Sequence, residues 1–162
     1  QTIWGELDYL VIDMPPGTGD IQISLAQKIS VSGAVIVSTP QQVALIDARK
    51  GIEMFKKVGI PVLGIVENMA THICSNCGHE ESIFGAHGAE AMAEEYQVAL
   101  LGSLPLDSRI REDVDQGSPT VASDPTGPLT AAYTSLAHNV AAQLWLRNQV
   151  TPVSPEIVML EE

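Results

Sequence analysis

Short runs of apolar residues alternate along this chain with segments that have the spacing of amphipathic helices. The runs cover residues 7–13 (LDYLVID), 32–39 (SGAVIVST) and 60–68 (IPVLGIVEN), with a weaker fourth at 98–105 (VALLGSLP). Near-continuous apolar runs with β-branched residues are typical of strands that are covered on both faces. The sequence therefore predicts four strands of a buried, parallel sheet.

Helical patterns occupy the intervals between these runs. In residues 41–58, apolar side chains recur at spacings of three and four and form one stripe. Residues 88–96 and 108–117 are shorter candidates, and a last helix is expected after Pro128. Strands and helices in this order form right-handed βαβ crossovers, so we expect an α/β fold with a mostly parallel, doubly wound sheet. Ligands of such sheets bind at the carboxyl ends of the strands.

The length of 162 residues suits a single domain. We expect that domain over residues 1–147 and a C-terminal tail over 148–162, because two prolines follow the last helical pattern. The chain begins with Gln1 and a strand is expected almost at once. We therefore expect a fragment or a cropped domain whose sheet is incomplete at the N-terminus.

Charge and cysteine content exclude several classes of function. The chain has 20 Asp and Glu against 8 Lys and Arg, a net charge of −12, which would repel nucleic acid and acidic membranes. No apolar run approaches the roughly 20 residues that span a bilayer. A disulfide between the only two cysteines would link positions three apart and would not stabilise a secreted fold. We therefore expect a reducing, cytoplasmic location.

The loop IDMPPGTGD, residues 12–20, follows the first apolar run. Asp13 would end that strand, where a carboxylate can hold a hydrated Mg²⁺. Two prolines would stiffen the exit, and Gly17 would let a backbone N–H approach an anion because no Cβ intervenes. An ordinary βα turn followed by a helix cap explains the same residues. On residue type alone, the two interpretations are balanced.

Cys74 and Cys77 form a C-x-x-C motif. One such pair supplies only two metal ligands, and no second pair exists. Two chains related by a two-fold axis would present four thiolates, which suits a [4Fe–4S] cluster or a structural Zn²⁺. His72 and His79 could instead complete a site within one chain, although the spacing is cramped. A redox motif or two free thiols in a loop are further alternatives.

Several segments together resemble one known family. LDYLVIDMPPGTGD resembles the second nucleotide motif of the Mrp/ApbC-type P-loop ATPases, which are iron–sulfur cluster carriers related to MinD and to the nitrogenase iron protein. The resemblance continues through VIVSTPQQVALIDARKGIEMF, GIVENM, the cysteine pair, LLGSLPLDSRIRE and DQGSPTVASDPTGPLTAAYTSLA, and it covers about residues 5–142. Several motifs in the same order are far more specific than any single one.

The resemblance implies roles in nucleotide binding. Asp13 would reach Mg²⁺ through water, Gly17 would lie near the γ-phosphate, and their loop would respond to hydrolysis. Asn68 would contact adenine, since its amide offers a donor and an acceptor, and the segment around Pro105 would line the other side of the base. Without the resemblance, Asn68 would be interpreted as a turn residue.

The resemblance also implies that Cys74 and Cys77 bridge a labile [4Fe–4S] cluster between the subunits of a homodimer and pass it to apo iron–sulfur proteins. The phosphate-binding motif of such ATPases needs Gly-Lys followed by Ser or Thr, and the sequence contains no Gly-Lys pair. We therefore expect the full-length parent to bind and hydrolyse Mg-ATP, and this chain alone to do neither.

Two rival functions belong to other classes. A MinD/ParA-like positioning ATPase would use a basic amphipathic C-terminal helix, but the sequence here ends in the acidic EIVMLEE. A zinc-stabilised interaction module without cluster transfer would use the same cysteine pair.

Overall fold

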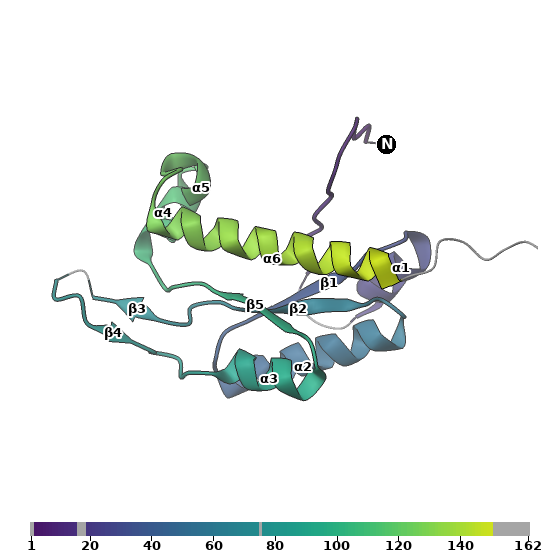
Figure 1. Ribbon diagram of the computed structural model, residues 1–162, viewed down its shortest axis with the longest axis horizontal. Helices are drawn as coiled ribbons and strands as arrows, with labels where there is room; N and C mark the ends of the chain where they lie inside the picture. Colours follow the sequence, from purple (N-terminus) through teal and green to yellow (C-terminus); the bar gives the residue numbers. More distant parts are fainter. Residues whose placement is uncertain (1, 16–18, 75, 151–162) are drawn as a thin grey trace, which may run out of the picture.

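The computed structural model describes residues 2–15, 19–74 and 76–150 (Figure 1). In chain order its elements are α1 (Asp20–Lys28), β1 (Ala34–Ser38), α2 (Gln42–Lys57), β2 (Val62–Glu67), β3 (His72–Ile73), β4 (Glu80–Glu81), α3 (Gly88–Tyr96), β5 (Ala99–Ser103), α4 (Ser108–Asp115), α5 (Thr120–Ser123) and α6 (Pro128–Val150). Three of the four expected strands and all the expected helices are thus confirmed. Helix α6 ends at Val150, and the rest of the expected tail, residues 151–162, lies outside the described residues.

The main sheet has the strand order β1-β2-β5, and both pairs are parallel. All six residues of the central strand β2 are buried. Because both faces of β2 are covered, its sequence VLGIVE is apolar up to its last residue instead of alternating with polar residues. The expected α/β fold with a parallel sheet is confirmed.

Helices cover both faces of this sheet (Figure 1). On one face, α2 and α3 pack against β1 and β2; this core includes Leu45, Ile52, Ile65 and Met92, which are at most 1% exposed. On the other face, α6 packs against β2 and β5, and its Tyr133, Leu136 and Val140 lie against buried Val66, Leu101 and Leu104. None of the described helices is long and apolar enough to cross a membrane.

The prediction of a strand at residues 7–13 is wrong. These residues form no strand, and the segment runs away from the sheet (Figure 1). Its apolar side chains are exposed, Val11 by 91% and Leu7 by 54%. A strand forms only where a neighbouring strand accepts and donates its backbone hydrogen bonds, and among the described residues no strand pairs with this segment. The apolar pattern alone does not reveal whether such a neighbour is present.

A second, two-stranded sheet carries the cysteine pair. Strands β3 and β4 are antiparallel, with His72 opposite Glu81 and Ile73 opposite Glu80. They form a hairpin that projects beyond the end of the main sheet where β2 and β5 finish (Figure 1). The sequence did not predict this hairpin, because each of its strands has only two residues.

Gly64 and Gly51 provide a matched pair of substitutions. A Cβ at Gly64 would overlap the Ala99 carbonyl oxygen and the Leu101 side chain, whereas at Gly51 it would meet only the Ile36 Cδ1 atom at 3.8 Å. We expect Gly64→Ala to destabilise the fold by about 1–3 kcal/mol. Gly51→Ala, in the interior of α2, should raise stability by up to about 1 kcal/mol. Urea unfolding measures both, and equal effects of the two changes would contradict the packing between β2 and β5.

Candidate functional site

The carboxyl ends of the three parallel strands are connected by backbone hydrogen bonds. The Asn68 N–H, which follows β2, donates to the carbonyl oxygen of Ser38 at the end of β1, over 2.7 Å. The Leu104 N–H, which follows β5, donates to the Glu67 carbonyl oxygen over 2.8 Å. The loops after β1, β2 and β5 therefore start side by side at one edge, as expected for a ligand site in a parallel sheet.

Asn68 lies in a shallow hollow at this edge. The hollow has a volume of about 440 Å³ and is lined by residues of β1, α2 and the β2 end, including Ser38, Thr39 and Asp47. The Asn68 Oδ1 atom accepts a hydrogen bond of 3.0 Å from the Met69 N–H, and Met69 has a left-handed φ of 56°. Asn68 thus stabilises a turn, as its residue type suggests. In the described part of the chain no hydrogen bond engages its amide nitrogen, which is the donor that a base would use.

Pro105 lies next to this region on the neighbouring strand end. The Ala70 N–H, just beyond Asn68, donates to the Leu104 carbonyl oxygen over 2.9 Å. Leu104 is buried, and Pro105 is half-buried beside it. The structure therefore brings the segments of Asn68 and Pro105 together, although they are far apart in sequence.

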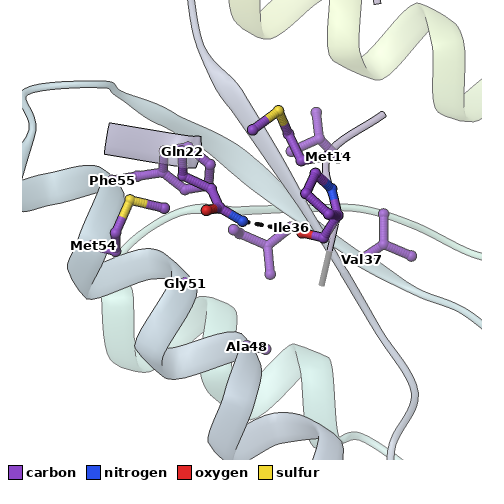
Figure 2. Close-up of a pocket in the computed structure, with 10 residues that line it drawn as sticks. Met14, Gln22, Ile36, Val37, Ala48, Gly51, Met54 and Phe55 are labelled. Atoms are coloured by element: carbon purple, nitrogen blue, oxygen red, sulfur yellow. Dashed lines mark hydrogen bonds between the residues drawn. The ribbon is translucent and has the colours of Figure 1, made fainter. Parts of the chain in front are cut away.

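Met14 and Pro15, which follow Asp13, lie beside β1 and α2. Asp13 itself is exposed, and Gly17 lies outside the described residues. The Pro15 carbonyl oxygen accepts a hydrogen bond of 3.0 Å from Nε2 of the buried Gln22 in α1 (Figure 2). Met14 and Pro15 line a cavity of about 190 Å³ with Gln22 and with residues of β1 and α2 (Figure 2).

The cavity beside Met14 and the hollow beside Asn68 share two lining residues, Val37 and Ala48. The loop after Asp13 and the turn at Asn68 therefore flank the same part of β1 and α2. The structure gives no direct contact between Asp13 and the segments of Asn68 and Pro105 among the described residues.

Glu67 is a functional candidate that the sequence analysis missed. It ends β2, is only 7% exposed, and its Oε1 atom accepts a hydrogen bond of 3.0 Å from the Ala89 N–H at the start of α3. A carboxylate at a helix N-terminus is favoured by the helix dipole and satisfies a free N–H group. The signal in the sequence was a charged residue at the end of an otherwise apolar strand. This bond joins the two ends of the segment that carries the cysteines.

Cys74 and Cys77 lie in the turn of the β3–β4 hairpin, and both are free thiols. The Cys74 N–H donates to the His79 carbonyl oxygen over 2.9 Å, and the Gly78 N–H donates to the Cys74 carbonyl oxygen over 2.8 Å. Gly78 has a φ of +71°, which glycine adopts without strain. Cys77 is exposed and Cys74 half-buried, so the thiols are accessible to an incoming metal or partner.

The turn also activates one thiol. Hydrogen bonds from the backbone N–H groups of Asn76 and Cys77, and one from the Cys77 side chain, lower the pKa of Cys74, and the nearby His72 acts in the same direction. The thiolate is the form that binds metals. The lowered pKa therefore favours the thiolate of Cys74.

The two histidines do not complete a metal site within the chain. His72 Nδ1 forms a hydrogen bond of 3.1 Å with the Leu106 carbonyl oxygen, and His79 is exposed. Among the described residues no group of three or more His, Cys, Asp or Glu side chains could hold a metal ion. In the part of the chain that the structure describes, the hairpin thus brings together two cysteine side chains.

Comparisons with known proteins give a matching family and named relatives. The family described as "ParA: NUBPL iron-transfer P-loop NTPase" matches residues 1–141. The chain is 62% identical over 152 residues to the iron-sulfur cluster carrier protein of Escherichia coli K12, covering 94% of this chain and 41% of that protein. It is 53% identical over 144 residues to the iron-sulfur cluster transfer protein NUBPL of Mus musculus, covering 89% of this chain and 45% of that protein.

Solved structures show the same fold. A nucleotide-binding protein from Archaeoglobus fulgidus, in complex with ADP and with cobalt found in it, matches with a TM-score of 0.63 and 45% identity over 70% of this chain and 47% of that one. The cell division ATPase MinD of Pyrococcus furiosus matches with a TM-score of 0.55 and 29% identity, over 68% of this chain and 43% of that one. The chain thus spans less than half the length of each of these relatives.

The pKa of Cys74 can be tested in the metal-free Cys77→Ser variant, whose Ser hydroxyl retains a hydrogen-bond donor. We expect the alkylation rate of Cys74 to rise with pH with a midpoint below the usual thiol value of about 8.5. The same variant unfolded in urea is the control, because unfolding removes the hydrogen bonds of the turn. A folded midpoint equal to the unfolded one would show that the turn does not stabilise the thiolate.

Proposed function

Because the chain belongs to the family of ParA/NUBPL-type iron-transfer P-loop NTPases, we propose that it is the cluster-binding part of an iron–sulfur cluster carrier. The observation that carries this proposal is the exposed C-x-x-C turn at the tip of a hairpin that starts beside Asn68 and Pro105. The relatives named as iron–sulfur cluster carrier and transfer proteins support it. The recipients of the cluster are apo iron–sulfur proteins, and the reducing cytosol is the compartment that suits two free thiols.

The cargo is a [4Fe–4S] cluster held between two copies of the chain. Each copy contributes Cys74 and Cys77, because thiolates are the preferred ligands of iron in such clusters and each described hairpin supplies only two. A two-fold axis through the cluster would place the same hairpin on both sides. Exposure of the thiols favours transfer, since a recipient's cysteines can approach the cluster directly. Zn²⁺ is the metal that would compete for the same four thiolates.

The nucleotide is ATP with Mg²⁺, and its site lies along the carboxyl edge of the sheet. Asp13 would hold Mg²⁺ through water, Gly17 would lie near the γ-phosphate, and Asn68 and Pro105 would contact the two sides of adenine. The ADP complex of the Archaeoglobus fulgidus relative supports a nucleotide site in this fold. The contact of Pro15 with Gln22 supports a role of this loop in moving α1 when the nucleotide changes.

Anaerobic reconstitution with iron and sulfide tests cluster binding. We expect a brown protein with visible absorbance, and we expect Cys74→Ser or Cys77→Ser to abolish the colour because each removes half of a copy's ligands. Asn76→Ser, which changes the same turn but keeps both thiols, is the matched control and should stay brown. A colourless wild-type protein that instead retains stoichiometric zinc would overturn the carrier function in favour of a zinc-stabilised module.

The 162-residue chain is not expected to bind Mg-ATP when isolated, because its sequence contains no Gly-Lys-Ser/Thr motif to surround the phosphates. Isothermal titration of this chain with Mg-ATP should give no binding at micromolar nucleotide. Binding at micromolar strength would show that Asp13, Asn68 and Pro105 form a sufficient site without that motif.

A further inference from the structure

Backbone hydrogen bonds join the segments that follow β2 and β5 beyond the ends of both strands. The Leu104 N–H donates to the Glu67 carbonyl oxygen, the Ala70 N–H donates to the Leu104 carbonyl oxygen, and the Leu106 N–H donates to the Thr71 carbonyl oxygen over 2.7 Å. These bonds do not have the regular spacing of a parallel ladder, and the strands themselves end at Glu67 and Ser103. The segments 70–71 and 104–106 are therefore irregular backbone held together by hydrogen bonds just beyond the sheet.

The side chain of His72 adds a further hydrogen bond between these two segments. Its Nδ1 atom lies 3.1 Å from the Leu106 carbonyl oxygen, in a partly buried contact. Because a carbonyl oxygen only accepts hydrogen bonds, Nδ1 carries the proton in this contact. His72 is also the first residue of β3, two positions before Cys74. One side chain thus joins the segment after β5 to the arm of the hairpin that leads to Cys74.

The other arm of the hairpin has no comparable bond. His79 is exposed, and so are Glu80 and Glu81 of β4. In the described part of the chain, none of these three side chains forms a hydrogen bond to the main sheet. A displacement of the Pro105 segment would therefore reach the Cys74 arm through the His72 side chain and through the backbone bond of Leu106 to Thr71. It would reach the Cys77 arm only through the turn.

We propose that His72 is a positioning residue that couples nucleotide binding to cluster binding. The inference rests on the proposed function and adds a route to it: contact of the base with the Pro105 segment shifts Leu106, and the bond to His72 passes that shift to the Cys74 thiolate. This route lies along β2 and β5, whereas the loop after Asp13 lies against β1 and α2. Coupling between two sites is reciprocal, so the cluster must change nucleotide affinity by the same factor.

The test compares Mg-ADP affinity of the full-length protein with and without the reconstituted cluster. In the wild type we expect the two dissociation constants to differ by about fivefold or more. His72→Ala should reduce this ratio to about one while each ligand still binds alone. His72→Asn should keep the ratio, because its amide nitrogen is as many bonds from Cα as Nδ1 and can donate to the same carbonyl. His79→Ala, on the other arm of the hairpin, is the matched control and should also keep it.

The outcomes separate the inference from the function on which it rests. The inference alone would be overturned if His72→Ala kept the wild-type ratio of the two dissociation constants. A ratio of one in the wild type, with both ligands bound, would also overturn it. Failure of the wild type to take up cluster or nucleotide would overturn the proposed function. A second measurement needs no variant: cluster loading without nucleotide should slow hydrogen exchange of the Leu106 amide. Unchanged exchange there would contradict the coupling even if His72→Ala did not fold.

Discussion

The parallel pairing of β2 with β5 is the interaction on which the rest of the structure depends. It places the turn at Asn68 beside the segment of Pro105, and irregular backbone hydrogen bonds beyond the strand ends fix where the cysteine hairpin begins. The pairing requires a close approach at Gly64, where the Ala99 backbone leaves no room for a side chain. Burial of β2 on both faces holds this arrangement rigid, so the two candidate sites share one stable base.

In comparison with the main sheet, the β3–β4 hairpin is exposed to solvent. Its strands have two residues each, and its turn is exposed. Its attachments are the Glu67 bond to α3, the backbone hydrogen bonds to residues 104–106 and the His72 side chain. Such a unit would present the proposed ligands Cys74 and Cys77 to solvent. This would suit the proposed transfer of a cluster, whereas a buried site with four ligands would retain its metal.

The elements predicted correctly are those whose sequence patterns lie within the element itself. Apolar runs and helical stripes gave three strands and the main helices, and the spacing of Cys74 and Cys77 gave a convergent pair. The run at residues 7–13 has the same apolar pattern as β2 but forms no strand, because pairing depends on a neighbour and not on composition. Glu67 and His72 were not predicted as connecting residues, since their partners Ala89 and Leu106 are far away in sequence.

The central claim is that each copy of the chain provides half of a cluster site. Native mass spectrometry of the anaerobically reconstituted protein tests it most directly, because one spectrum gives both the number of chains and the metal content. The predicted species contains two chains and one cluster of four irons and four sulfides. A single chain that retains a complete cluster would contradict the claim, since the described hairpin supplies only two thiolates.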